Sequence, residues 1–275
     1  MTTATRRLKA SARKTSAQAK SKAAPTIPAK SEAETNTWFT PAALKFLRSL
    51  ERNNRREWFE PRKPEFEREL KQPMLKIIER VTDAMTEFSP AHVRPAQKCM
   101  MRIYRDTRFS SDKSPYKRNI AAWWSRDGLE KTSGGGYYFH LSGKEVVIAA
   151  GVYMPEREQL SAIRKYLLDH HDEVRALLND KKLRRQMDSF DGLRLTRPPK
   201  GFPKEHPAMD LILCRQWGVG ATLPAETALS QNFVREIVQR FRLVAPLVEA
   251  LNTPLVRALK QNKRVLFPMN GRILG

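Results

Sequence analysis

The sequence of 275 residues has no hydrophobic run that approaches the roughly 18–20 residues needed to cross a bilayer, and its beginning is basic and hydroxyl-rich rather than apolar. We therefore expect neither a membrane-spanning nor a secreted protein. Acidic residues are also scarce: 29 Asp and Glu stand against 51 Lys and Arg, which gives a formal charge of +22. This excess favours polyanionic partners such as nucleic acid. Hydrophobic residues still make up 40% of the chain, which excludes a mainly disordered protein.

Cysteine and cofactor motifs are rare as well. Cys99 and Cys214 lie among apolar neighbours, so the sequence predicts buried thiols in a reducing, cytoplasmic compartment rather than a disulfide framework. The five histidines have no metal-ligand spacing, so no metal site is expected. The glycine run 134–136 has no Lys-Ser/Thr after it and precedes a predicted strand, which fits a flexible hairpin loop better than a nucleotide-binding loop. No serine has a nucleophile-elbow pattern, so the sequence assigns no cofactor and no catalytic residue.

The first 37 residues differ in composition from the rest. They contain eight Lys and Arg, two acids, and only Leu8 and Ile27 as large aliphatic side chains, so they cannot bury a core. We expect a disordered polybasic tail over residues 1–37, a single α+β domain over 38–260 and a basic C-terminal tail over 261–275.

Apolar residues recur at helical spacing on both sides of the chain's centre. A first helix is predicted between Thr40 and Asn53, with a proline in its first turn. A longer stripe over 66–85 predicts a second helix that Pro73 kinks or splits. Further helices are predicted from residue 155, around 174–178 and over 233–259.

Short segments rich in β-branched and aromatic residues predict strands at 97–104, 120–124, 137–141 and 145–153. Residues 142–144 have hairpin-turn chemistry, so the last two strands should pair antiparallel. The run 146–150 has no polar face, as expected of a central strand. Strands in the middle with helices on either side predict an α+β fold with a central, mostly antiparallel sheet flanked by helices. We also expect Trp58 to be buried against this sheet.

The segment 102–117, RIYRDTRFSSDKSPYK, gathers cations, acids and turn residues in one loop. Strand alternation places Arg105 on the face of Met101 and Ile103, where its guanidinium needs a partner. Guanidinium, ammonium and hydroxyl groups that converge on a loop favour a phosphate or carboxylate ligand. The alternative is that Arg105 and Asp106, and likewise Asp112 and Lys113, simply neutralise each other in a solvated hairpin.

A second basic loop, 194–204, is stiffened by three prolines, and a rigid loop loses less entropy when a ligand orders it. The alternative for this loop is a plain surface connector. His140 alternates with Tyr138 on a predicted strand and is the one histidine that we place near a site. The candidate anion-binding residues are Arg102, Arg105, Arg108, Lys113, Lys117, Arg197 and Lys200, with Asp106, Asp112, Tyr116 and His140 in supporting positions.

The 102–117 segment carries a resemblance to a known family. Other matching residues are Phe46-Leu47, Leu50, Asn53-Asn54-Arg55, Glu57-Trp58-Phe59, Gly136-Tyr137-Tyr138, Gly151-Val152-Tyr153, Arg164 and Arg197 to Phe202. Over roughly residues 38–259 the chain resembles the uncharacterised bacterial and fungal family known as domain of unknown function 2461. The resemblance implies one α+β domain, brings no established activity, cofactor or substrate, and adds weight to a functional site in the 102–117 segment.

Three functions are compatible with these patterns. The first is a protein that binds nucleic acid or another polyanion through its basic tail and a basic loop. The second is an enzyme or binder of a small phosphorylated or carboxylated ligand, centred on the 102–117 segment. The third is a domain that interacts with other proteins and whose charge serves solubility.

The polybasic tail generates a first prediction. Removal of residues 1–37 should leave folding intact but weaken binding to nucleic acid, because eight cations are lost and almost no apolar side chains. Each lost phosphate contact should lower the log–log salt slope by about 0.7–0.9. Filter-binding titrations of the full and truncated chains at several salt concentrations measure this, and equal affinities would exclude the tail from the interaction.

Overall fold

The structure is a computed structural model that describes residues 38–129, 134–190 and 193–266. The predicted tail over 1–37 and most of the predicted C-terminal tail lie outside these residues. No helix within the described ranges is long and apolar enough to cross a membrane.

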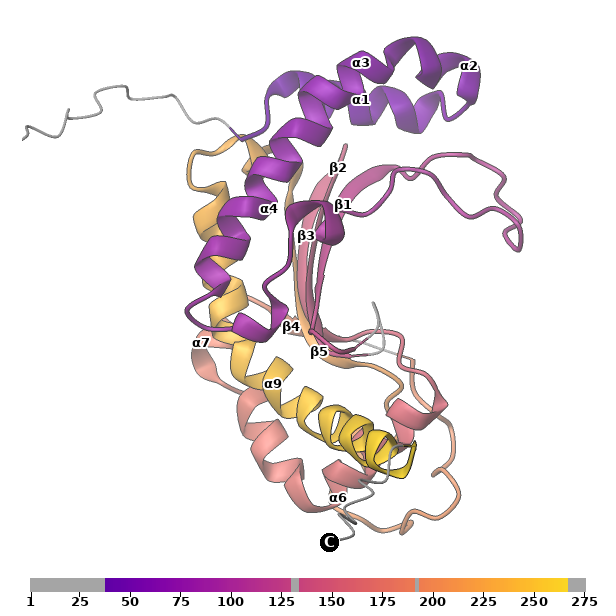
Figure 1. The fold of residues 1–275 in the computed structure, drawn as a ribbon, viewed down its shortest axis with the longest axis vertical. Coiled ribbons are helices and arrows are strands. Elements are labelled where there is room, and N and C mark those ends of the chain that lie inside the picture. The colour runs from indigo at the N-terminus through magenta and orange to yellow at the C-terminus, as the bar shows by residue number, and fades with distance from the viewer. Residues whose placement is uncertain (1–37, 130–133, 191–192, 267–275) are drawn as a thin grey trace, which may run out of the picture. The chain divides into compact units, whose positions relative to one another are not determined.

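The centre of the fold is a five-stranded sheet in which every strand pair is antiparallel (Figure 1). The predicted α+β class is confirmed, and so is the hairpin at residues 142–144. The apolar run 146–150 lies in a strand with neighbours on both sides, as predicted. In spatial order the strands are β1 (Asn119–Ser125), β2 (Gly136–Ser142), β3 (Glu145–Val152), β5 (Trp217–Pro224) and β4 (Asp188–Ser189).

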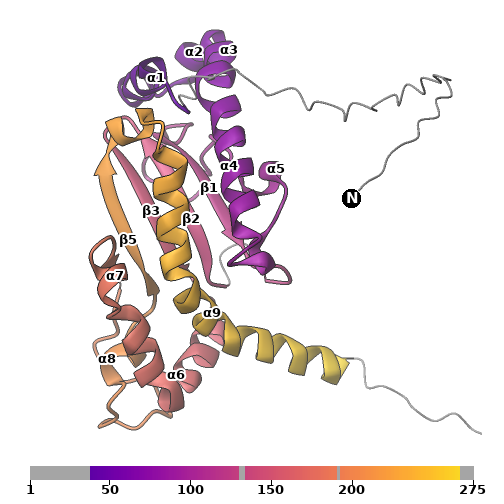
Figure 2. The same cartoon turned by 90° about the vertical axis from the view of Figure 1, so that its left-hand side faces the viewer.

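Helices cover one face of the sheet. Figure 2 shows α4 (Gln72–Met85) and the first part of α9 (Phe233–Leu266) lying across it. The predicted first helix is confirmed as α1 (Pro41–Arg52). The remaining helical elements are α2 (Arg56–Phe59), η1 (Glu60–Arg62), α3 (Lys63–Phe66), η2 (Glu67–Lys71), η3 (Pro90–His92), α5 (Ala96–Cys99), α6 (Arg157–Leu178), α7 (Lys181–Arg184), α8 (Met209–Ile212) and η4 (Ala225–Leu229).

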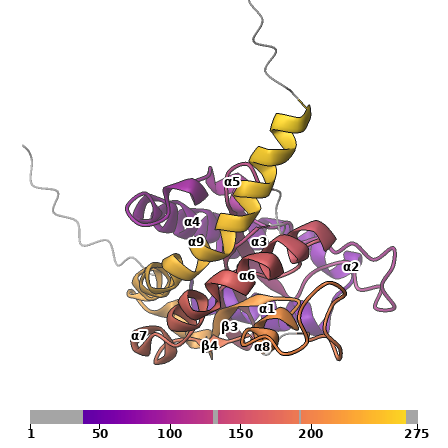
Figure 3. The same cartoon turned by 90° about the horizontal axis from the view of Figure 1, so that it is seen from below.

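Strand alternation sorts side chains between the two faces of the sheet. In β2, Tyr137 and Phe139 are buried on the helical face, where Phe241 of α9 contacts Tyr137 at 5.0 Å between ring centroids. Tyr138 and His140 point to the other face, which we call the open face. Two long segments, 101–118 and 193–208, flank the open face on the side of the sheet away from α4 (Figures 1 and 3).

The predicted strand at 97–104 is wrong. Its first residues form the short helix α5, and the rest is extended chain with two isolated bridges, Met100 to Ala122 and Tyr104 to Tyr116. Pro95 begins the helical turn, and Pro115 opposite the extended part has no amide N–H to donate, so a continuous ladder does not form.

The predicted burial of Trp58 against the sheet is also wrong. Its neighbour Phe59 is the buried residue, at 1% exposure. Trp58 is half-buried on Phe46 of α1, with the Arg62 guanidinium 4.7 Å above its ring. Adjacent positions in a helix point about 100° apart, so α2 can turn only one of the two rings fully into the core.

The helical chain is irregular near Pro73 and again at His170. The helical chain continues from Lys63 through Met85, and the π-helical stretch η2 precedes Pro73. Proline removes one helical hydrogen bond and clashes with the carbonyl four residues earlier, so a widened turn accommodates it without splitting the helix. The two helices predicted after residue 155 are confirmed: they lie within α6 on either side of a kink at His170, whose backbone is non-helical.

The glycine run 134–136 is not a flexible loop, because its residues are buried. The Asn252 side chain of α9, fully buried, accepts a hydrogen bond from the Gly135 N–H at 2.8 Å and donates one to the Gly135 carbonyl at 3.0 Å. This amide therefore satisfies both backbone groups of one residue and attaches the start of β2 to α9.

Both cysteines are buried and free, as predicted. Burial raises the pKa of the Cys99 thiol to about 12. Cys214 follows α8, and its carbonyl accepts a hydrogen bond from Arg164 of α6 at 3.1 Å. Arg164 also donates to the Ile212 carbonyl, so this buried arginine satisfies the end of α8 rather than a ligand.

A buried chain of hydrogen bonds surrounds His92. The Tyr137 hydroxyl donates to Ser89 Oγ at 2.9 Å, Ser89 Oγ lies 2.8 Å from His92 Nδ1, and His92 Nε2 lies 3.0 Å from the Gly135 carbonyl. In the neutral imidazole each of these contacts pairs one donor with one acceptor. Burial lowers the pKa of His92 from 6.5 to about 4.

Acid should therefore destabilise the fold through His92. Between pH 6.5 and 4 the unfolded chain binds a proton at this residue that the folded chain does not, so the free energy of unfolding should fall by about 1.4 kcal/mol per pH unit, about 3 kcal/mol in total. Urea unfolding at pH 7 and pH 4.5 measures the loss. The variant His92→Gln should lose less stability over the same interval, and equal losses in both proteins would contradict the assignment.

Candidate functional site

Residues 101–118 form two antiparallel segments joined by a tip, which we call the arm (Figure 1). The Arg105 N–H donates to the Pro115 carbonyl at 2.9 Å, and the Lys117 N–H donates to the Ile103 carbonyl at 2.7 Å. These bonds hold residues 103–105 against 115–117 at the base of the arm. Arg105 and Lys117 lie near opposite ends of the 102–117 segment in the sequence. These hydrogen bonds bring them together at the base of the arm.

Asn54 anchors the base of the arm to the helical layer. Its side-chain amide donates to the Tyr116 carbonyl at 2.9 Å and accepts from the Tyr116 N–H at 3.0 Å. The Phe59 ring stacks on the Tyr116 ring with 4.1 Å between centroids, and the Tyr116 hydroxyl donates to Glu60 at 3.2 Å. Tyr116 is thus a buried anchor of the arm, not a ligand-facing group.

The tip of the arm is held by its own polar groups. Asp106 accepts from Arg108 Nε at 3.0 Å, from Arg108 Nη2 at 2.7 Å and from the Arg108 N–H at 3.2 Å. These hydrogen bonds lower the pKa of Asp106 to about 2. Lys113 Nζ donates to the Thr107 carbonyl at 3.0 Å. The expected pairs Arg105–Asp106 and Asp112–Lys113 are therefore wrong, because Asp106 pairs with Arg108 and Asp112 with Arg105. The candidates Arg108 and Lys113 therefore lie in a local network at the tip, and neither lines a cavity described below.

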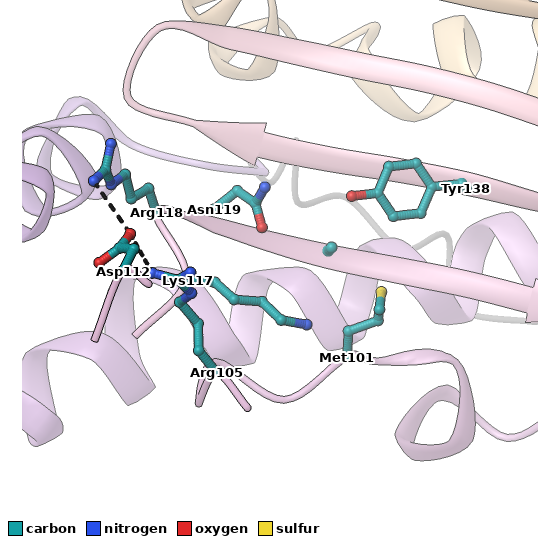
Figure 4. Close-up of a pocket in the computed structure, with 8 residues that line it drawn as sticks. Met101, Arg105, Asp112, Lys117, Arg118, Asn119 and Tyr138 are labelled. Carbon is teal, nitrogen blue, oxygen red and sulfur yellow. Dashed lines mark hydrogen bonds and ion pairs between the residues drawn. The ribbon is translucent and has the colours of Figure 1, made fainter. Parts of the chain in front are cut away.

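A cavity of about 400 Å³ lies between the base of the arm and the open face of the sheet (Figure 4). Of the candidate residues, the structure brings Arg105, Asp112 and Lys117 together here. The sequence analysis did not identify the other polar residues of the cavity, Arg118, Asn119 and Tyr138. Of these, only Tyr138 has a sequence signal, its alternation with His140 on one strand. The residues that line the cavity are Met101, Arg105, Asp112, Lys117, Arg118, Asn119, Ala121 and Tyr138.

Asp112 compensates part of the positive charge in the cavity. Its carboxylate accepts a hydrogen bond from Arg105 Nη1 at 2.5 Å and lies 3.8 Å from Arg118 Nη2. The Ser114 hydroxyl and N–H also donate to it, and with Arg105 they hold the pKa of Asp112 well below its usual range. Three cations against one ionised carboxylate leave the cavity with an excess of positive charge.

Lys117 supplies the uncompensated cation. Its side chain is half-buried and runs from the base of the arm into the cavity, where its ammonium lies beside Met101 (Figure 4). Burial, and then the charge of Arg102, lower the pKa of Lys117. Within the described ranges no acidic group lies within ion-pair distance of its ammonium. A half-buried ammonium without a counter-ion attracts an anion more strongly than an exposed one does.

A chain of polar groups leads from the cavity along the open face. The Tyr138 hydroxyl lies 3.0 Å from His140 Nδ1, and His140 Nε2 lies 3.9 Å from Glu145 Oε1. Burial raises the pKa of Tyr138 to about 12 and lowers the pKa of His140, while Glu145 opposes the second shift. At neutral pH the tyrosine is therefore protonated, and its hydroxyl can donate a hydrogen bond into the cavity.

The other candidates lie elsewhere. Arg102 lines a second cavity on the helical side of the arm. Arg197 and Lys200 are exposed on the segment 193–208, and neither makes an ion pair with any residue that the structure describes. The same described ranges contain no group of three or more His, Cys, Asp and Glu residues that could hold a metal ion.

Comparison with known proteins adds one match. A family model described as conserved hypothetical protein (DUF2461) matches residues 42–249, about three quarters of the chain. The matched range includes the arm, Asn54 and every residue that lines the cavity. No curated protein matches the chain.

Loss of the Asn54 anchor should loosen the arm. Asn54→Ala leaves both backbone groups of Tyr116 without partners, which should destabilise the protein by about 1–3 kcal/mol. Hydrogen exchange at the Arg105 and Lys117 amides, which bridge the base of the arm, should accelerate. Arg108→Ala is the matched control, because an exposed tip residue should change stability by less than about 0.5 kcal/mol. Unchanged exchange in Asn54→Ala would show that the sheet alone positions the arm.

Proposed function

The chain belongs to the DUF2461 family of conserved hypothetical proteins, and we propose that it binds a small anionic ligand, a phosphate or carboxylate compound, in the cavity between the arm and the sheet. The observation that carries this proposal is the Lys117 ammonium. It is half-buried, enters the cavity and has no acidic partner in the described part of the chain.

The remaining lining groups complement such a ligand. Arg105 and Arg118 share Asp112, so their guanidinium groups are held in place at the cavity wall. Guanidinium forks recognise carboxylate and phosphate oxygens in two-point contacts. Asn119 and Tyr138 add neutral donors, and a volume of about 400 Å³ lies in the range of small-ligand sites. The ligand's anionic group binds at Lys117, and its uncharged part contacts Met101 and Ala121.

Tyr138 gives this site a chemical capability beyond binding. Its protonated hydroxyl can donate to a carbonyl or ester oxygen of the ligand, and His140 can then exchange a proton with it through the 3.0 Å contact. Residues with pKa values shifted by burial in a cavity are typical of acid–base sites. This supports acid–base chemistry on the bound anion as the activity of an enzyme with this site.

Polyanion binding is the second candidate, and exposed cations favour it. Arg102, Arg194, Arg197 and Lys200 are exposed and make no ion pair within the described ranges. Arg194, Arg197 and Lys200 come from segment 193–208, which flanks the open face, whereas Arg102 lies on the helical side of the arm (Figures 1 and 3). A nucleic-acid strand on the open face would contact the cations of segment 193–208, and the net charge of +22 would attract it.

Lys117 and Lys113 form a matched pair of variants for anion binding. Calorimetric titration with inorganic pyrophosphate should show saturable binding to the wild type. Lys117→Met should weaken it about tenfold or more, since a hydrogen bond to a charged group contributes about 1.5–3 kcal/mol. Lys113→Met should keep the wild-type affinity, because Lys113 Nζ is engaged at the tip of the arm.

Three outcomes separate the candidates. Equal weakening by the two lysine variants would indicate a diffuse charge effect and contradict a specific site. Absence of pyrophosphate and phosphate binding, together with salt-dependent binding of a single-stranded oligonucleotide, would favour the polyanion function. Loss of binding in Lys117→Met alone would support the cavity as the ligand site.

A further inference from the structure

We propose that the second cavity, a groove between the helical layer and the extended chain 97–104, binds an amphipathic anion: an apolar chain that carries one carboxylate or phosphate group. This site shares only Met101 with the cavity of the proposed function, and its cations are different ones, so the inference does not depend on that function. The volume of the groove is about 480 Å³. The residues that line it are Phe59, Lys63, Phe66, Glu67, Lys71, Leu75, Gln97, Met100, Met101, Arg102, Ile103 and Tyr104.

The floor of the groove is apolar. Phe59, Phe66 and Ile103 line the groove and belong to the buried core, with exposed fractions of 1%, 5% and 7%. Above them, Met101 and Tyr104 remain 37% and 43% exposed. Partly exposed apolar side chains gathered along one groove, rather than scattered singly, mark a binding surface.

The rim of the groove is cationic and only partly compensated. Glu67 forms an ion pair with Lys71 at 2.8 Å. Lys63 and Arg102 are exposed and have no ion-pair partner among the described residues. Apolar walls with two unpaired cations at the edge complement a ligand with an apolar body and an anionic head.

The helical wall of the groove has an unusual backbone. Glu67 and Lys71 begin and end the π-helical stretch η2, which carries them to the rim. π-Helical turns occur frequently at functional sites. Pro73 explains why the helix widens here. Because Glu67 and Lys71 of the widened turn line the groove, the turn is also part of the proposed binding surface.

The size of the groove favours a small ligand over a protein. A stable protein interface involves about 20–30 residues on each side. A cavity of about 480 Å³ lies instead in the range that encloses a small molecule. The occupant is therefore a small amphipathic anion, and the head group that it carries is decided by experiment.

The test uses the full chain labelled with ¹³C at its methionine methyl groups. Met100→Leu assigns the Met100 signal, because Met100 lines the groove and not the cavity between the arm and the sheet. This signal should shift saturably when sodium decanoate is added below its micelle concentration. Decyltrimethylammonium, with the same chain and the opposite charge, should bind at least tenfold more weakly. Monodecyl phosphate in a parallel titration shows whether a phosphate or a carboxylate head is preferred.

Variants at the rim make the test specific to the groove. Lys63→Gln combined with Arg102→Gln should weaken decanoate binding by about tenfold, because two unpaired cations are lost. Arg80→Gln, at an exposed position of α4 outside the groove, should leave binding unchanged. Sulfate should not displace decanoate from the groove, because Arg105, Lys117 and Arg118 line the other cavity and not the groove.

Several results would overturn the proposal. Absence of a saturable shift at Met100 would show that decanoate does not occupy the groove. Equal affinity for the cationic amphiphile, or an unchanged affinity in the double variant, would show a non-selective apolar surface. These outcomes do not depend on pyrophosphate binding, so a failure here is distinct from a failure of the proposed function.

Discussion

The paired hydrogen bonds between the Asn54 amide and the Tyr116 backbone are the constraint on which both cavities depend. They connect the turn after α1 to the base of the arm, and the Phe59–Tyr116 stack seals the same junction. The anion cavity lies between the base of the arm and the sheet, and the groove lies between the arm's first segment and the helices. An amide that satisfies one donor and one acceptor on the same residue leaves little freedom for either wall to move.

The charges of the arm are distributed unequally, and the distribution separates structure from binding. At the tip, the Arg108 guanidinium donates two hydrogen bonds to the Asp106 carboxylate, so the charges of this pair cancel locally. At the base, one carboxylate serves two arginines while Lys117 has no acid of its own within the described residues. Exposed pairs contribute little to stability, whereas an uncompensated cation at a partly buried wall costs free energy that an anion can offset.

Sequence reasoning recovered β1, β2 and β3, because hydrophobic alternation and hairpin chemistry are local signals, but it missed β5 and β4. The prediction of a strand at 97–104 failed because the backbone there depends on two prolines that are distant in the sequence, Pro95 and Pro115. For the site, the motif itself pointed to Arg105 and Lys117, but Arg118 and Asn119 carry no signal that distinguishes them from ordinary strand-start residues. Tyr138 reaches the cavity only through the pairing of β1 with β2, a long-range contact that residue types do not specify. The Asp106–Arg108 contact depends on a turn geometry that sequence spacing alone does not determine.

The two buried thiols give the protein internal reporters of its own opening. A thiol reacts as the thiolate, and with the pKa of Cys99 raised to about 12 by burial, this residue is almost inert while the surrounding structure stays closed. Cys99 ends α5 beside the groove, whereas Cys214 lies beyond α8 at the Arg164 contact. Alkylation rates at these two positions therefore measure local opening free energies in two separate parts of one fold, with no label introduced from outside.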